Sequence, residues 1–329
     1  MILVTGATGF LGTHLLQELR KQDMPVRALY HKNEPNQELR EQVQWQQCNL
    51  LDTAEIEMAM KGIKYVFHCA AVVSFDPRKK HEMIENNVTI TANIVNAALN
   101  ENVHKLLHVS SIAAIGRAYP EKGSQEKIFI DEKTPWTESK NNSSYAESKY
   151  LSELEIWRGM AEGLNTAIIN PSVILGEGDW DKGSAKLMQV VDQEFPWFTE
   201  GINGWVDVKD VVNALLLLMN KETNGERFII NNGNYAYKDI FTQMALALNK
   251  KPPHKKASKW IIELVWRFEL LKSRLARKEA TITKETARTA QTQCFYNNEK
   301  FLKQFPEFQY QSIEDTILRM ASIYLTMPK

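Results

Sequence analysis

Tyr145 and Lys149 are the two residues whose types and spacing most directly suggest chemistry. They lie four positions apart, so a helix would carry both side chains on one face. A free phenol has a pKa of roughly 10, which is too high for proton transfer near neutral pH. A neighbouring ammonium group stabilises the phenolate and lowers that pKa, which suits the pair to general acid–base catalysis. The competing interpretation is an exposed tyrosine beside an unrelated lysine.

A glycine-rich segment near the amino terminus predicts a second kind of site, one for phosphate. It follows a short apolar run and precedes an amphipathic stretch, so it would join a strand to a helix. Glycines at this spacing permit a tight turn, close approach of a pyrophosphate and close packing of helix on strand. The start of the helix also offers N–H groups to an anion. We therefore expect dinucleotide contacts from Gly6, Thr8, Gly9, Phe10, Leu11 and Gly12.

The elements that would position these residues alternate along the first half of the chain. Continuously apolar runs predict strands at residues 1–4, 26–30, 43–48, 65–69, 105–109 and 166–170. Amphipathic stretches predict helices at residues 11–22, 54–61, 85–100 and 145–159. Strands that alternate with helices form parallel sheets covered on both faces. The predicted fold class is therefore α/β, a Rossmann-type doubly wound parallel sheet with a smaller, mostly helical substrate lobe.

The pattern changes after residue 175. Residues 176–204 are rich in Gly, Asp and Trp and predict a loop region with one helix at 185–192. A helix at 211–219 and a strand at 227–230 follow, and from residue 239 the chain is mostly helical. We expect a dinucleotide-binding domain formed by residues 1–175 plus about 204–232, and a substrate-binding lobe formed by about 176–203 plus 233–329.

The order of these features resembles the extended short-chain dehydrogenase/reductase superfamily, of the NAD-dependent epimerase/dehydratase type. Similar motifs follow one another over nearly the whole chain, at residues 5–12, 67–71, 87–88, 109–111, 145–149, 170–172 and 206–211. The resemblance implies hydride transfer between a nicotinamide cofactor and a carbinol or carbonyl carbon, with the cofactor supplying the hydride chemistry.

The resemblance also assigns roles to single residues. Tyr145 would move the proton, and Lys149 would bind the hydroxyl groups of the nicotinamide ribose. Ser111 lies five residues before Gly116, the family register of the residue that orients the substrate oxygen, so we prefer it to Ser110. The alternative for Ser111 is an ordinary serine at the end of a strand.

Further cofactor contacts are expected at the ends of the predicted strands and in the helices that follow. They are Asn49, Leu50, Ala70, Ala71, Asn87, Pro171 and Ser172. The two alanines would let the chain pass under the cofactor ribose. Asn49 and Leu50 replace the family's Asp-Leu pair, and an asparagine can still accept a bond from the adenine amino group.

The choice of dinucleotide depends on the segment Tyr30-His31-Lys32, which has no acidic residue before Glu34. NAD enzymes usually place a carboxylate here for the ribose 2′-hydroxyl, whereas NADP enzymes place basic groups for the 2′-phosphate. Lys32 can pair with a phosphate, so we expect NADP in preference to NAD. Arg27 is a further candidate, and the alternative is that its side chain points the other way from the strand. The competing interpretation treats His31 and Lys32 as a solvated turn.

Reduction, epimerisation and dehydration share this apparatus, so the fold leaves the reaction open. The family's dehydratases carry an Asp-Glu pair where this chain has Ile112 and Ala113, neither of which can transfer a proton. Residues 170–172, 282–285 and 295–300 are more similar to the dihydroflavonol reductase and 3β-hydroxysteroid dehydrogenase branch. We expect a reductase of a ketone or aldehyde. The alternatives are a sugar-nucleotide epimerase with tightly held NAD and a non-catalytic dinucleotide-binding regulator.

Composition and charge bear on the partners. The 329 residues include 40 Lys or Arg and 40 Asp or Glu, so no net field favours nucleic acid or an anionic membrane. Three widely spaced cysteines argue against disulfides and metal ligation and favour a reducing compartment. With neither a signal peptide nor an apolar stretch long enough to span a bilayer, we expect a cytoplasmic protein with a small-molecule substrate. The family resemblance implies a homodimer.

Aromatic residues gather in two segments that help to close the substrate site in the family. They are Tyr119, Trp136, Trp180, Trp197, Phe198 and Trp205. Such residues suit a flat or apolar substrate, although they can equally form the core of the lobe. An amphipathic helix at 260–275 is expected to pack on the lobe or at a subunit interface, and the alternative is a membrane surface. Its apolar residues are Trp260, Leu264, Phe268, Leu271 and Leu275.

Overall fold

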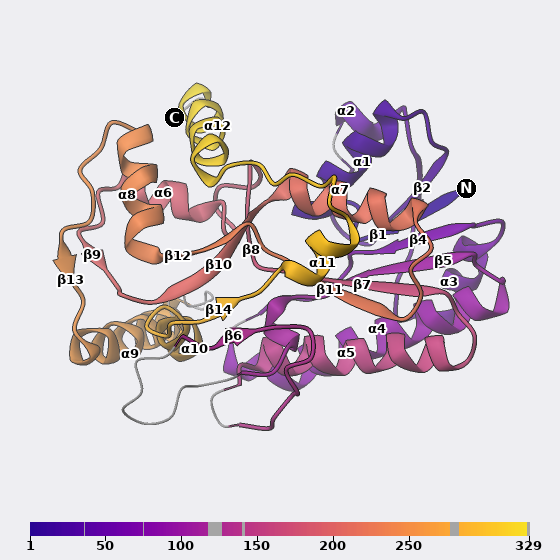
Figure 1. Cartoon of the computed structure of the whole chain (residues 1–329), viewed down its shortest axis with the longest axis horizontal. Helices are drawn as coiled ribbons and strands as arrows, with labels where there is room; N and C mark the ends of the chain where they lie inside the picture. Colours follow the sequence, from indigo (N-terminus) through magenta and orange to yellow (C-terminus); the bar gives the residue numbers. More distant parts are fainter. Residues whose placement is uncertain (36, 75, 118–126, 140–141, 277–282, 328–329) are drawn as a thin grey trace.

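A seven-stranded parallel sheet forms the centre of the molecule (Figure 1). The computed structural model describes residues 1–35, 37–74, 76–117, 127–139, 142–276 and 283–327. The strands are β1 (Ile2–Thr5), β2 (Val26–Tyr30), β3 (Gln44–Gln47), β4 (Tyr65–His68), β5 (Lys105–Val109), β7 (Thr166–Pro171) and β11 (Glu226–Ile230). Their order, β11-β7-β5-β4-β1-β2-β3, reverses between β1 and β4. Sheets of this type bind ligands at the carboxyl ends of the strands beside such a reversal.

Helices cover both faces of the sheet because successive residues of a strand point to opposite sides. Ile2 and Val4 belong to a core with α1 (Phe10–Lys21), α2 (Gln37–Arg40), α7 (Val208–Asn220) and α11 (Glu299–Gln304). Leu3 belongs to a core with α3 (Thr53–Met60), α4 (Lys80–Asn100) and α5 (Ser144–Ala161). A central parallel strand must be apolar on both sides for this reason.

A smaller unit lies beside the large sheet, on the left of Figure 1. It contains a three-stranded sheet of β8 (Val173–Leu175), β10 (Ile202–Asp207) and β12 (Gly233–Ala236), in which β10 runs parallel to β8 and antiparallel to β12. Helices α6 (Lys186–Asp192), α8 (Tyr237–Ala247) and α12 (Ile313–Thr326) pack around Trp205, which is fully buried.

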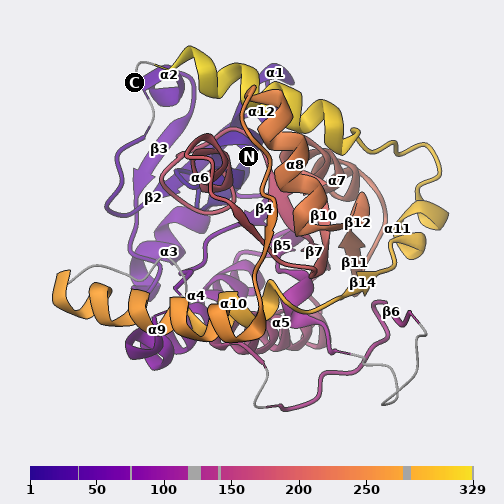
Figure 2. The same cartoon turned by 90° about the vertical axis from the view of Figure 1, so that its left-hand side faces the viewer.

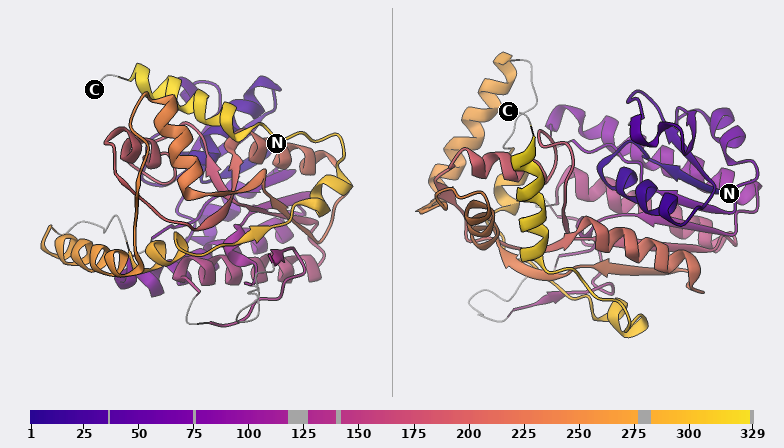
Figure 3. Two further views of the ribbon diagram at one scale, coloured as in Figure 1. Left: turned by 60° about the vertical axis from the view of Figure 1, so that its left-hand side comes forward. Right: turned by 90° about the horizontal axis from the view of Figure 1, so that it is seen from above.

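Short elements complete the fold. Two pairs of two-residue strands form where distant segments meet: β6 (Phe129–Ile130) with β14 (Phe295–Tyr296), and β9 (Trp197–Phe198) with β13 (Lys255–Lys256). The remaining helices are α9 (Lys259–Ala276), α10 (Lys284–Thr289) and the two 3-10 helices η1 (Pro77–Lys79) and η2 (Ile112–Ala114). Views from other sides show α9 along one edge of the molecule (Figures 2 and 3).

The predicted doubly wound α/β fold is confirmed, and the predicted strand at 105–109 is found with those bounds. Two expectations need correction. Residues 176–204 are not only loop and helix, because they include β9 and the first part of β10. Helix α4 begins at Lys80 rather than at residue 85, since η1 leads directly into it and adds its first turn.

The amphipathic helix predicted at 260–275 is α9, and much of its apolar side is exposed. Ile262 is buried, whereas Trp260 and Phe268 are 71% and 67% exposed. The side chains of Leu271 and Leu275 lie outside the described residues. Within the described part of the chain, no helix combines the length and the apolar character needed to cross a membrane. Packing of α9 on a subunit or on a membrane surface stays a prediction.

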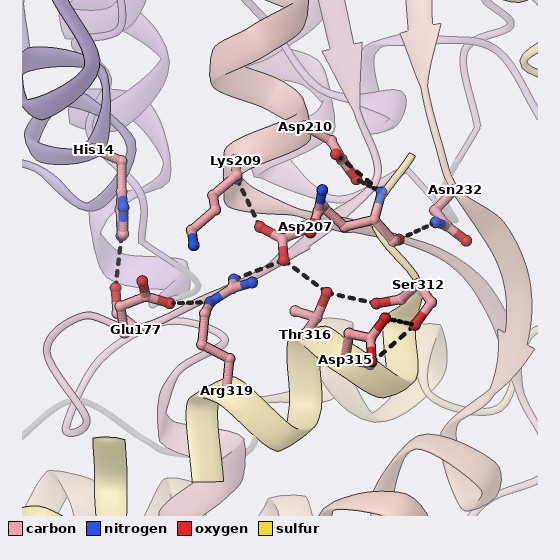
Figure 4. A network of polar contacts seen from close by, with 11 residues as sticks. His14, Glu177, Asp207, Lys209, Asp210, Asn232, Ser312, Asp315, Thr316 and Arg319 are labelled. Atoms are coloured by element: carbon pink, nitrogen blue, oxygen red, sulfur yellow. Dashed lines mark hydrogen bonds and ion pairs between the residues drawn. The ribbon is translucent and has the colours of Figure 1, made fainter. Parts of the chain in front are cut away.

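A network of ion pairs and hydrogen bonds centred on the buried Asp207 connects helix α12 with the start of α7 (Figure 4). The Arg319 guanidinium donates to Asp207 at 2.6 Å and to Glu177 at 3.2 Å. Thr316 also donates to Asp207, which is fully buried at the start of α7, and the His14 ring on α1 lies 2.8 Å from the carbonyl oxygen of Glu177. Single contacts of the network therefore join residues up to 163 apart in sequence.

Replacing Arg319 with leucine should destabilise the protein, because it leaves the Asp207 carboxylate buried without its countercharge. Breaking one side of such a pair costs about 3 kcal/mol or more. We expect a clear fall in the urea midpoint of unfolding, followed by circular dichroism. Lys303→Met is the matched control, since it breaks the exposed Lys303–Glu299 pair. Equal midpoints for the two variants would contradict this account.

Candidate active site

The glycine loop is built around contacts that leave no room for a side chain. Gly6 has a φ of 64°, and a Cβ there would lie 2.7 Å from the backbone nitrogen of Ala70, just after β4. A Cβ on Gly12 would collide with the Gly6 carbonyl oxygen. The Gly9 N–H donates to that oxygen at 2.9 Å and closes the turn. The loop thus has the tight turn and close helix packing that the spacing predicts.

Helix α1 begins without a capping side chain, because its N-cap residue is the exposed Gly9. A helix start presents unsatisfied N–H groups and the positive end of the helix dipole. Phosphate oxygens would satisfy these groups, so the loop fits a dinucleotide pyrophosphate. Thr8 is half-buried in the loop, Leu11 is buried in the core, and the Phe10 ring lies against Gly176 and Gly178.

A chain of hydrogen bonds holds the end of β1 against the end of β4. The Ala70 N–H donates to the Thr5 hydroxyl, which lies 2.8 Å from Nδ1 of His68. His68 Nε2 lies 3.2 Å from the Thr91 hydroxyl, which donates to the carbonyl oxygen of Asn87. Burial lowers the pKa of His68 to about 3, so the ring is neutral. These partners are consistent with a proton on Nε2, so each donor in the chain has an acceptor.

Asn87 shapes the wall beside this loop through its side-chain amide. Its Oδ1 accepts from the Val72 N–H at 2.7 Å, and its Nδ2 donates to the Val72 carbonyl at 2.9 Å and to the Ser148 hydroxyl at 3.2 Å. Ala70 and Ala71 are partly buried at the same place, and Val73 is 57% exposed. The amide of Asn87 is therefore engaged within the protein, and its direct contact with a dinucleotide stays a prediction.

Ser111 and Tyr145 come together beyond the carboxyl end of β5. Ser111 caps η2, where its Oγ accepts from the Ala113 N–H at 3.1 Å. Tyr145 lies in the first turn of α5, which Ser143 caps by accepting from the Ala146 N–H at 3.0 Å. The side chains of Ser111 and Tyr145 are hydrogen-bonded to each other. Two helix starts thus bring the predicted pair into contact.

Lys149 follows Tyr145 by one turn of α5 and is buried. Its Nζ donates to the carbonyl oxygen of Val109 at 3.0 Å. Burial lowers the pKa of Lys149 to about 8, against the opposing charges of Cys69 and Glu153. Burial raises the pKa of Tyr145, while its hydrogen bond with Ser111 acts in the other direction. The expected lowering by the Lys149 ammonium is not found, because burial dominates.

The segment after β2 presents His31 and Lys32 to solvent. Tyr30 is partly buried, with its ring edge-to-face against Trp45 at 6.3 Å between centroids. Glu34, the first acidic residue of the segment, pairs with Arg40 at 2.7 Å. The nearest carboxylate in sequence is thus engaged elsewhere, and two basic or titratable groups lie exposed at the end of the strand.

Arg27 and Asn49 lie near this segment, and only Asn49 remains a candidate for a contact with the cofactor. Arg27 was a further candidate for the 2′-phosphate, but its guanidinium donates to the carbonyl oxygens of Ala59 and Lys61 beside the end of α3, so that expectation is wrong. Asn49 lies near the end of β3, and its Oδ1 accepts from the Leu51 N–H at 3.2 Å. Leu50 beside it is partly buried. An adenine contact from Asn49 would share that oxygen and stays a prediction.

The end of β7 supplies Asn170, Pro171 and Ser172, all of them buried. The Ser172 hydroxyl donates to the carbonyl oxygen of Ile230 at 3.3 Å. Asn170 contacts Ser111 and Glu153, a buried residue of α5 that the sequence reasoning does not include in the site. Its spacing of four from Lys149, on the Tyr145 face of the helix, is the signal that could have found it.

The predicted substrate aromatics divide into core and surface. Trp205 and Trp180 are buried in the core of the smaller unit, so the core interpretation holds for them. Trp136 stacks on Tyr150 at 4.5 Å, close in sequence to Tyr145, while Trp197 and Phe198 are half-buried in β9. Tyr119 lies outside the described residues. The three cysteines are unpaired, and the described residues contain no group of His, Cys, Asp or Glu suited to a metal ion.

Comparison with known families shows which protein family the chain belongs to. The sequence profile of the NAD dependent epimerase/dehydratase family matches residues 2–233, more than half of the chain. The chain belongs to that family. As a member of the NAD dependent epimerase/dehydratase family, it falls among NAD(P)-dependent oxidoreductases and epimerases, and the resemblance to the extended short-chain dehydrogenases/reductases is confirmed.

Relatives of this family member include several proteins named as reductases. It is 26% identical to the putative dihydroflavonol 4-reductase of Synechocystis over 83% of this chain and 80% of that protein. It is 28% identical to cinnamoyl-CoA reductase 1 of Petunia hybrida over 70% of this chain and 72% of that protein. It is 29% identical to sterol demethylase protein B of Methylococcus capsulatus over 69% of this chain and 68% of that protein.

Solved structures of the family share the fold over the whole chain. The crystal structure of gox2253 superposes with a TM-score of 0.82 at 25% identity, covering 99% of this chain and 98% of that one. UDP-glucose 4-epimerase of Thermotoga maritima superposes with a TM-score of 0.77 at 20% identity, covering 98% of each chain. At that lower identity the likeness concerns the fold alone.

Proposed function

We propose that this family member reduces a ketone or aldehyde with hydride from NADPH. Bound NADPH would supply the hydride to the carbonyl carbon. Ser111 donates to the carbonyl oxygen and orients it, and Tyr145 gives that oxygen the proton that completes the alcohol. Lys149 binds the ribose hydroxyls. The hydrogen bond between the Ser111 and Tyr145 side chains carries the proposal, because it directs both groups to one point.

Reduction is favoured over the family's other reactions by the residues beside Ser111. Ile112 is buried and Ala113 has no polar side chain, so η2 offers no acid–base pair for eliminating water. Relatives named as dihydroflavonol 4-reductase and cinnamoyl-CoA reductase support reduction of a carbonyl group. Exposed Val72 and Val73 beside Asn87 suit an apolar substrate.

A second candidate is a sugar-nucleotide epimerase with tightly held NAD. Epimerase structures of the same fold with bound NAD support it, including one from Thermus thermophilus at 19% identity. A regulator that binds a dinucleotide without turnover is the third. We further propose a dinucleotide-binding domain of residues 1–175 plus about 204–232, a substrate lobe of about 176–203 plus 233–329, a homodimeric assembly and a cytoplasmic location.

Tyr145→Phe should lower carbonyl reduction by roughly 10²–10⁴-fold, because the proton donor is lost. NADPH oxidation is followed with a panel of a dihydroflavonol, cinnamoyl-CoA, a 3-ketosteroid and UDP-glucose. Tyr65→Phe, at the start of β4, is the matched control and should retain full activity. Conversion of UDP-glucose without net NADPH oxidation would establish the epimerase instead. Tight dinucleotide binding with no turnover of the panel would favour the regulator.

Lys32→Glu should shift the dinucleotide preference from NADPH toward NADH. A carboxylate in place of the ammonium repels the 2′-phosphate, and losing one charge-assisted bond should weaken NADPH binding about tenfold or more. Dissociation constants from the fluorescence of each reduced dinucleotide give the readout. Lys61→Glu makes the same charge change at the end of α3 and is the control. If wild-type protein prefers NADH, the NADP proposal is refuted.

The rate of reduction should fall as pH rises through about 8. Lys149 has its pKa lowered to about 8 by burial, so it is cationic below that pH and neutral above it. Tyr145 has its pKa raised, so it keeps its proton over the same range. The kcat/KM profile should therefore be level on the acid side and decline on the alkaline side. In Lys149→Met the decline should be absent, at a much lower rate. A wild-type profile that stays level well above pH 8 would count against Lys149.

A further inference from the structure

A buried carboxylate on α5 lies one turn beyond the proposed catalytic pair. Tyr145, Lys149 and Glu153 follow one another at intervals of four and share one face of the helix. Glu153 is only 1% exposed. A carboxylate in that position costs free energy unless it is paired and hydrogen-bonded. Its partners therefore indicate what it does.

One carboxylate oxygen of Glu153 is connected to the main chain of Ser111 through the side chain of Asn170. Asn170 Nδ2 donates to Glu153 Oε1 at 2.5 Å and to the main-chain carbonyl of Ser111 at 2.9 Å. Both contacts are accepted by oxygen atoms, so the NH₂ end of the asparagine faces them. The carboxylate thus determines which end of the Asn170 amide faces Ser111, and the amide determines where the Ser111 main chain lies.

The other carboxylate oxygen of Glu153 accepts a hydrogen bond from Arg227, which is itself held by Glu132. Arg227 donates to Glu153 Oε2 at 3.2 Å, and its Nε and second nitrogen donate to the Glu132 carbonyl oxygen at 3.0 and 2.6 Å. The Glu132 carboxylate in turn accepts from the Ile229 N–H at 2.8 Å. Three separate segments, β7, β11 and the segment around Glu132, therefore hold the carboxylate in one orientation, although the residues lie up to 97 apart in sequence.

We propose that Glu153 is a positioning residue that sets the place of Ser111 through Asn170. This inference rests on the proposed function, because it assigns Ser111 to the reacting oxygen. Glu153 acts on Ser111 through Asn170, and its side chain is also hydrogen-bonded to Ser110, the residue before Ser111. Its negative charge also supports the protonated form of Lys149, one turn earlier on the helix. The Glu153 carboxylate thus affects both Ser111 and Lys149, the two residues proposed to act with Tyr145.

The test is a double-mutant cycle between Glu153 and Ser111. Glu153→Gln removes the charge, and loss of the alignment at Ser111 should lower kcat/KM by about tenfold to a hundredfold. Dinucleotide binding should stay at the wild-type level. At a pH well below 8, where Lys149 stays cationic, the same change in a Ser111→Ala background should cost no more than about twofold, because the group being positioned is already gone. The alkaline decline of the pH profile should also move to lower pH in Glu153→Gln.

Controls separate this inference from the function it rests on. Glu155→Gln alters a partly exposed carboxylate on the same helix, paired with Arg158, and should leave the rate unchanged. Glu153→Asp keeps the buried charge but shortens its reach, so it should show the same loss if Glu153→Gln does not fold. An equal loss in both backgrounds overturns the positioning role alone. An unchanged rate in Ser111→Ala overturns the proposed role of Ser111 together with this inference.

Discussion

The close approach of Gly6 to Ala70 is the constraint on which the candidate site depends. It brings the ends of β1 and β4 together at the point where the strand order reverses, with no side chain between them. Any larger residue at position 6 would meet backbone atoms, which cannot move without displacing a central strand. The neutral His68 ring and its threonine partners maintain this spacing from beneath, and a pKa of about 3 keeps the ring neutral throughout the physiological range. The floor of the site is therefore rigid and insensitive to pH.

Buried charge pairs extend that rigidity to the parts of the chain that come later. Arg319 with Asp207 fixes the last helix, and Glu153 with Arg227 fixes the ends of β5, β7 and β11 around Ser111. Such pairs add little net stability compared with apolar packing, yet leaving one partner alone is costly. Their effect is to exclude other arrangements of the same segments. The first network joins α12 to the start of α7, and the second joins α5 to β7 and β11.

The sequence predicts those parts of the fold and site that depend on residues close together in the chain. The glycine spacing, the apolar runs of β1, β2, β4 and β5 and the Tyr145–Lys149 interval each depend on residues within one turn or strand, and each is found as expected. Strand β3 is instead Gln-Trp-Gln-Gln and partly exposed, since it lies at the edge of the sheet. For Arg27 the sequence leaves two directions open, and only the structure shows that its guanidinium contacts the carbonyl oxygens at the end of α3. The helical spacing from Lys149 could have singled out Glu153, but its partners could not be predicted, because Asn170 and Ser111 lie 59 residues apart and Arg319 and Glu177 lie 142 apart. The lowered pKa of Lys149 and the raised pKa of Tyr145 depend on burial, which only the packed structure supplies.

Those two pKa values bear on the direction of the chemistry. A tyrosine whose pKa is raised by burial holds its proton and is suited to giving it to a carbonyl oxygen during reduction. Oxidation of an alcohol would need the phenolate, which only a nearby positive charge could stabilise in such a buried place. Lys149 can provide that charge below about pH 8, and an oxidised nicotinamide would add another. Burial of Tyr145 therefore favours the protonated phenol that donation requires. Removing a proton would require the positive charge of the oxidised cofactor, so the redox state of the bound dinucleotide would itself select the protonation state that each direction needs.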